Sequence, residues 1–220
     1  MSFVDRVRMN VDKTMKAMVR NARALPFPEP YWIRDPMAIT DILKQNYTQE
    51  IRGMIDVYSV GREEIGTILC VDAGGSGQLL LGHECRGKSA SVVVKDCKPF
   101  GIAVGTLHTH PGSQPALSPG DLQVGIIGTY FACVSWKDET KKYWLKAVTF
   151  DTYYFKPYEQ QLFVDSKIED SLRLEREMQY VIRDLSRVTD PTAQANRYIS
   201  QLVALCTSIE NMLGSYTTEL

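Results

Sequence analysis

Apolar residues recur along this chain at two different spacings, which predict helices in some stretches and strands in others. Intervals of three and four residues, typical of one face of a helix, run through residues 3–24 and again from residue 40 to about residue 58. Between them, residues 25–36 contain four prolines and are predicted to be extended. Shorter apolar runs then predict strands at residues 65–71, 78–81, 89–94, 101–107, 130–136 and 143–150.

Helical spacing returns in the last part of the chain. Residues 168–188, and those that follow Pro191, carry wide apolar stripes that predict a hairpin of two helices. A short helix is also predicted from Ser118 to Ile127, between two of the strands. The whole pattern predicts an α/β fold with a mixed β-sheet flanked by helices. We divide it into an N-terminal helix and proline-rich linker (1–37), a central domain (38–165) and a C-terminal helical hairpin (166–220).

Composition narrows the class of protein. The 220 residues are 44% hydrophobic with a formal net charge of −1, so the chain as a whole lacks the basic character of a nucleic-acid-binding protein. We find no apolar run of the roughly 18 residues that a membrane span needs, and we expect no signal peptide because the first residues lack its apolar centre. Five cysteines without C-x-x-C spacing are expected to be reduced thiols of a cytoplasmic protein: Cys70, Cys85, Cys97, Cys133 and Cys206.

The stretch from Gly105 to Asp121, GTLHTHPGSQPALSPGD, carries the candidate chemistry. His108 and His110 end a predicted strand, where side chains two residues apart face the same side. Asp121 falls in the first turn of the short helix that Ser118 caps. Two imidazoles and one carboxylate form a known catalytic zinc ligand set, which leaves one position open for water.

Each of these residues also has an ordinary structural interpretation. Alternating histidines on a strand often satisfy only local hydrogen bonds, Asp121 could complement the helix dipole, and Ser118 could serve only as a cap. A second pair of potential ligands, His83 and Cys85, has no further ligand at a suitable spacing, and we interpret it as a loop.

Together, the spacing H-x-H-P, six residues, then S-x-x-D resembles the signature of the JAMM (MPN+) metalloproteases over roughly residues 38–165. That family also has an acidic residue upstream in the form E-x-x-G. Glu63 stands three residues before Gly66 and fits this spacing, with Cys70 where the family commonly has glycine. Glu64 is the alternative, because a shift by one residue leaves the apolar pattern of the strand acceptable.

The resemblance implies an MPN-like fold and one Zn²⁺ per chain, held by His108, His110 and Asp121. It also implies that Glu63 or Glu64 acts as the general base and that Ser118 stabilises the oxyanion. Members of the family, such as the proteasome-lid deubiquitinase, cut the amide bond after the C-terminal Gly-Gly of ubiquitin or a ubiquitin-like modifier. This chain resembles a compact, archaeal-type relative. The alternatives are a non-catalytic MPN scaffold, the processing of a sulfur-carrier or ubiquitin-like precursor, and a small-molecule amidase.

Partners are expected to be modifier conjugates, and the terminal helices are expected to contact the proteasome or another assembly. The first helix carries a basic face, interpreted as solvated or as a surface for an acidic partner. We expect residues 73–98 to order over the substrate tail, which would add to a free sheet edge. The aromatic run of Tyr153, Tyr154, Phe155 and Tyr158 is left open between lining that groove and packing beneath the C-terminal helices.

Overall fold

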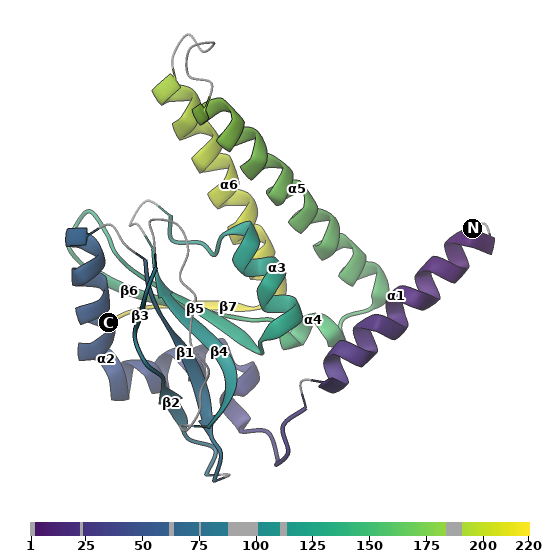
Figure 1. Cartoon of the computed structure of the whole chain (residues 1–220), viewed down its shortest axis with the longest axis horizontal. Helices are drawn as coiled ribbons and strands as arrows, with labels where there is room; N and C mark the ends of the chain where they lie inside the picture. The colour runs from purple at the N-terminus through teal and green to yellow at the C-terminus, as the bar shows by residue number, and fades with distance from the viewer. Residues whose placement is uncertain are drawn as a thin grey trace.

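A computed structural model of the chain describes residues 3–22, 24–61, 64–74, 76–87, 101–110, 114–183 and 191–220. It confirms the predicted α/β class: one open, mixed sheet of seven strands with six helices in the described residues (Figure 1). No helix in this part of the chain is long and apolar enough to cross a membrane.

The sheet has the strand order β2-β1-β4-β5-β6-β7, and β3 also pairs with β1. β4 and β5 are parallel, whereas every other pair is antiparallel. Parallel neighbours need a crossover connection, and α3 (Pro119–Gly128) provides it. The strands are β1 (Ile65–Asp72), β2 (Leu79–Leu81), β3 (Cys85–Arg86), β4 (Gly101–Thr109), β5 (Phe131–Lys137), β6 (Tyr143–Thr149) and β7 (Ser215–Glu219).

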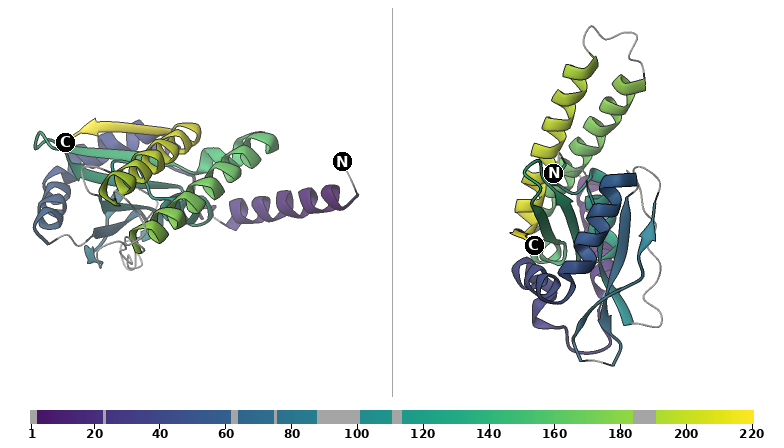
Figure 2. Two further views of the ribbon diagram at one scale, coloured as in Figure 1. Left: turned by 90° about the horizontal axis from the view of Figure 1, so that it is seen from above. Right: turned by 90° about the vertical axis from the view of Figure 1, so that its left-hand side faces the viewer.

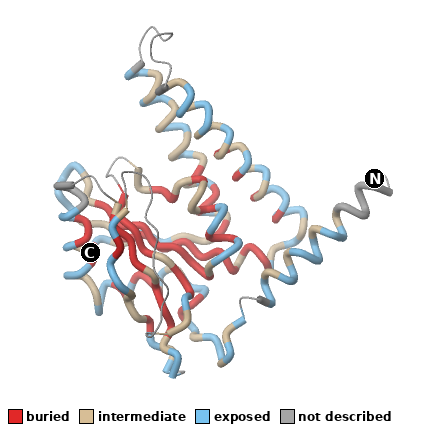
Figure 3. The backbone as a smooth tube through the Cα atoms, in the orientation of Figure 1, coloured by how far each residue is buried: buried red, intermediate tan, exposed pale blue. Residues whose placement is uncertain are grey.

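Helices cover both faces of the sheet and bury it (Figure 3). On one face lie a short 3₁₀ helix, η1 (Tyr31–Arg34), and α2 (Pro36–Gly61), which is kinked at Tyr47. The other face carries α3, α4 (Asp151–Phe155), α5 (Tyr158–Arg183) and α6 (Pro191–Leu213). α5 and α6 lie side by side and extend beyond the sheet (Figures 1 and 2).

Alternation along the strands explains the two apolar cores. Phe131 and Cys133 pack on the α2 side, whereas Ala132 and Val134 pack on the side of α3 to α6. Successive strand side chains point to opposite faces, and a strand buried on both faces is apolar at nearly every position. β5 is therefore a central strand. It pairs in parallel with β4, so the carboxyl ends of the two strands lie at the same edge of the sheet.

The C-terminal region differs from the predicted hairpin in two ways. α5 begins at Tyr158, earlier than expected, and the last residues form β7, which pairs with β6 at the edge of the sheet. The polar sequence Ser215–Glu219 gave no strand signal because both of its faces lack an apolar run. The C-terminal segment is thus part of the sheet as well as of the hairpin.

The cysteines differ from the predicted set of reduced thiols. Cys85, Cys133 and Cys206 are buried free thiols, but Cys70 is disulfide-bonded, so the expectation of reduced thiols throughout is wrong. Sequence spacing does not reveal which cysteines meet in space. The strand predicted at residues 89–94 lies outside the described residues.

In the N-terminal helix α1 (Phe3–Ala22), Lys13 and Arg20 lie over the rings of Tyr158 and Phe155 of the same chain. Lys16 forms an ion pair of 2.8 Å with Asp165 of α5 and lies over the ring of Tyr153. Met15 and Met18, from the predicted apolar stripe, are instead exposed. This part of the basic face is therefore already paired within the chain.

Candidate metal centre

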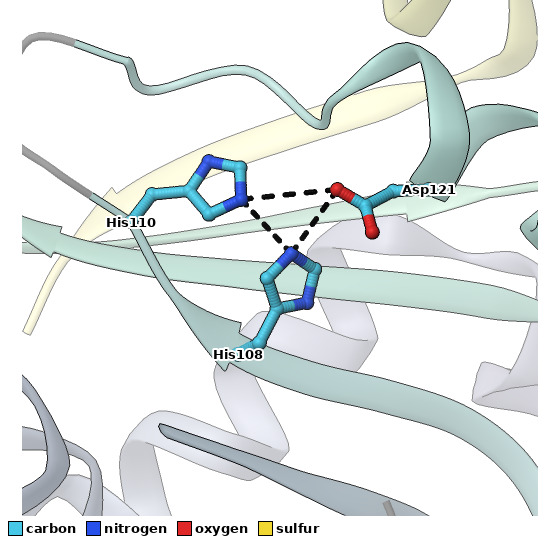
Figure 4. A group of neighbouring side chains, drawn as sticks. All are labelled: His108, His110 and Asp121. Carbon is cyan, nitrogen blue, oxygen red and sulfur yellow. Dashed lines mark hydrogen bonds and ion pairs between the residues drawn. The ribbon is translucent and has the colours of Figure 1, made fainter. Parts of the chain in front are cut away.

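Three side chains converge at the carboxyl end of β4, where the chain passes toward α3 (Figure 4). His108 lies in β4, His110 follows the strand by one residue, and Asp121 lies in the first turn of α3. In parallel sheets, ligands commonly bind at this end of the strands, beside the crossover helix. The two histidine side chains are buried, at 8% and 6% exposed, and Asp121 is half-buried.

The distances among the three residues fit a single ion. His108 Nε2 lies 3.0 Å from His110 Nε2, and Asp121 Oδ2 lies 3.3 Å and 3.8 Å from these two nitrogens. Ligands about 2.1 Å from a tetrahedral zinc are about 3.4 Å apart. No other group of at least three such ligands was found among the described residues.

A backbone contact holds His110 in the form that a metal requires. His110 Nδ1 lies 3.0 Å from the carbonyl oxygen of Gln114, which can only accept a hydrogen bond. The proton therefore sits on Nδ1, and Nε2 presents its lone pair to His108 and Asp121. A fixed tautomer of this kind is the usual support of a histidine that ligates a metal.

The pKa values of the two histidines are shifted in opposite directions. Burial, followed by the charge of His108, lowers the pKa of His110 to about 4. Burial also lowers the pKa of His108, but the charge and hydrogen bond of Asp121 outweigh it and leave that pKa raised. Asp121 has a lowered pKa, because His108 and Ser118 outweigh the effect of its burial. In the absence of a metal ion, protonated His108 therefore supplies the positive charge that a bound cation would supply.

Ser118 and Asp121 form the start of α3 together. Ser118 Oγ accepts from the Asp121 amide at 3.1 Å, and the Ser118 amide donates to Asp121 Oδ2 at 2.9 Å, which is a capping box. The Ser118 hydroxyl also donates to Asp121 Oδ2 at 2.6 Å. Ser118 thus orients the Asp121 carboxylate, and its hydroxyl is engaged with that carboxylate.

A buried ion pair anchors the loop before Ser118, and sequence reasoning missed it. Glu210 of α6 accepts the Leu117 amide at 2.6 Å and forms a 2.9 Å ion pair with Lys146 of β6. Both side chains are nearly inaccessible, at 1% and 9% exposed. The only sequence signal was a charge within an apolar stripe and another within a strand. The hairpin therefore holds the main chain next to Ser118.

Of the two candidate bases, the structure describes Glu64 alone, because Glu63 lies outside the described residues. Ile65 packs in the α2 core, so alternation turns the preceding residue toward the opposite face, where His108 lies across from Gly66. Burial raises the pKa of Glu64, the charge of His108 lowers it and that of Asp121 raises it. Glu64 therefore lies within electrostatic reach of the metal centre.

The remaining predicted residues lie elsewhere. Cys85 lies in the short strand β3 and not in a loop, so that part of the loop interpretation is wrong; among the described contacts its thiol reaches the carbonyl of His83 at 3.7 Å. Tyr153 and Tyr154 are buried beside α5 and α3 and donate to Asp165 and to the Ile126 carbonyl. The packing interpretation is thus confirmed for these two, whereas Phe155 is exposed.

No family model, no curated protein and no solved structure matches this chain.

Proposed function

We propose that this chain is a zinc-dependent isopeptidase of the JAMM type, which hydrolyses the amide bond after the C-terminal Gly-Gly of ubiquitin or a ubiquitin-like modifier. The observation that carries the proposal is the convergence of His108, His110 and Asp121, with separations of 3.0 to 3.8 Å between their ligand atoms. The motif resemblance supplies the substrate class.

Zinc bound by these residues would lower the pKa of a coordinated water toward about 7 and polarise the scissile carbonyl. Glu64 then accepts a proton from the attacking water and returns it to the departing nitrogen, as a general base and acid. Glu63 remains the alternative for this role on its spacing to Gly66. Ser118 Oγ donates to the oxygen that gains negative charge.

The second candidate is a non-catalytic MPN scaffold, which keeps the fold without the chemistry. The burial of both histidines and the Gln114 contact that fixes the His110 tautomer favour a catalytic metal site. A non-catalytic scaffold would not need two histidine Nε2 atoms that converge. Processing of a ubiquitin-like or sulfur-carrier precursor uses the same site and differs only in the group attached to the Gly-Gly carbonyl.

The test compares zinc content and cleavage in the wild type and in His110→Ala. We expect about one zinc per wild-type chain, loss of most of it in the variant, and chelator-sensitive cleavage of lysine-linked diubiquitin or of a ubiquitin fusion. His83→Ala serves as the control, because His83 lies outside the metal centre. Equal zinc in wild type and His110→Ala, or cleavage that survives chelation, would refute the proposal.

A further inference from the structure

A cavity of about 80 Å³ opens directly beside the metal centre, between the loop before α3 and the helical hairpin. His110 and Ser118 form its wall on the side of the metal centre. The opposite wall comes from α5 and α6, through Glu175, Met178, Ile199, Leu202, Val203 and Cys206. The cavity is therefore continuous with the place where the scissile bond would lie.

Glu175 is the one acidic side chain of this otherwise mostly apolar hairpin wall. It is half-buried, and within the described part of the chain its pKa is raised by burial and then by the charge of Asp121, with no hydrogen bond to its carboxylate. A carboxylate that is partly withdrawn from water loses some of its hydration, and a cation entering the cavity would offset that loss. Neither the metal site nor the fold uses Glu175.

The shape and charge of the cavity suit the departing side of the substrate. The Gly-Gly side has no side chains, so it cannot fill an apolar cavity. A lysine side chain combines an unbranched apolar stem with a nitrogen that becomes cationic, and such stems bury well along apolar surface. An α-linked leaving group would bring a bulky backbone to the same narrow place.

We propose that this cavity is the leaving-group subsite, and that it takes the aliphatic stem and amine of a lysine side chain. The inference rests on the proposed isopeptidase function. Hydrolysis breaks the bond between the carbonyl carbon and the lysine Nζ. The hydroxyl of water joins the carbon and its proton joins the nitrogen. The new carboxylic acid then gives its proton to the amine, which leaves as an ammonium that Glu175 pairs with.

The subsite is tested by binding, which requires no turnover. The probes are Nα-acetyl-lysine methylamide and its norleucine analogue, which keeps an apolar chain but has no amine. Saturation-transfer NMR on the zinc-loaded protein should show transfer to the lysine methylenes and at least about tenfold tighter binding than for norleucine, the scale of a charged hydrogen bond. Norleucine binding as tightly as lysine would overturn the proposal.

Substitutions in the wall of the cavity test whether the lysine probe binds there. Glu175→Gln should weaken lysine binding at least about tenfold, and Leu202→Phe should abolish it by filling the cavity. Glu177→Gln is the matched control, because Glu177 lies on the same helix but is exposed, and it should bind as the wild type does. Unchanged binding in Glu175→Gln refutes the subsite even if Leu202→Phe does not fold.

The two proposals fail in different ways. Binding of the lysine probe without any cleavage of diubiquitin would refute the isopeptidase function, and with it the leaving-group role, and would leave only a cavity that binds lysine. Chelator-sensitive cleavage, with the same KM for lysine-linked diubiquitin in wild type and Glu175→Gln and no lysine binding, would refute the subsite alone.

Discussion

At the scale of single residues, the adjacent carboxylates Glu63 and Glu64 pose the sharpest question. Spacing to Gly66 favours Glu63, whereas strand alternation and the charges of His108 and Asp121 bring Glu64 to the site. We predict that Glu64→Gln lowers kcat by about 10²- to 10⁴-fold, the usual contribution of a general base, and leaves the zinc content unchanged. Glu63→Gln is the matched control. If Glu63→Gln loses the activity instead, the glycine spacing identifies the base.

The opposed pKa shifts of the histidines predict a proton release. His108 has a raised pKa and His110 a lowered one, about 4. At pH 6, below the ordinary histidine value of about 6.5, His108 is therefore protonated in the metal-free protein and His110 is neutral. Zinc must displace that proton. Calorimetry in two buffers of different ionisation enthalpy should report about one proton released per zinc. Uptake without proton release would contradict the shift assigned to His108.

Sequence predicts the three candidate metal ligands better than it predicts the residues that position them. His108, His110 and Asp121 were found because their spacing is set by one strand and one helix start, which are local features. Glu210 and Glu175 reach the site from the hairpin, far away in the chain, and their roles depend on tertiary packing. No local spacing could show that Glu210 accepts the amide of Leu117.

At the scale of elements, the pair of Lys146 and Glu210 joins β6 to α6 and to the loop before α3. Burial raises the pKa of Glu210, and Lys146 opposes that shift. We predict that Lys146→Met lowers the free energy of unfolding by about 3–5 kcal/mol, because it leaves a charge buried without its partner. Denaturant unfolding measures the loss.

Two variants complete that experiment. Lys146→Met combined with Glu210→Gln should recover part of the stability, because a glutamine can still accept the Leu117 amide while it carries no charge. Lys142→Met removes the exposed ion pair with Glu219 and should have little effect, because surface ion pairs contribute little. Equal losses for Lys142→Met and Lys146→Met would show that the buried pair has no special role.

The elements themselves were largely predictable. β1, β4, β5 and β6 begin and end within about two residues of the apolar runs that predicted them, because each is buried and therefore apolar. β7 was missed because it is held mainly by backbone pairing with β6, which leaves no pattern in the side chains. The start of α5 was misjudged because the aromatic residues before it also suit a loop.

At the scale of the whole molecule, the metal centre lies between two different surfaces. The hairpin of α5 and α6 closes one side through the cavity beside His110. On the other side, Gly66 pairs with both His108 and Cys85, so that β3 lies across β1 from the histidine strand. No described strand covers the outer edge of β2 and β3. Under the proposed function, this edge would take the Gly-Gly tail and the hairpin would take the leaving group.

This arrangement predicts where a modifier will protect the chain from hydrogen exchange. An extended tail that adds to a sheet edge forms main-chain hydrogen bonds with it, so ubiquitin bound to the zinc-loaded protein should slow exchange across residues 79–87. Free ubiquitin carries no leaving group, and the hairpin amides of residues 175–183 should therefore stay unchanged. Protection confined to the helices beyond residue 166, with none between residues 79 and 87, would show that the tail does not use this edge.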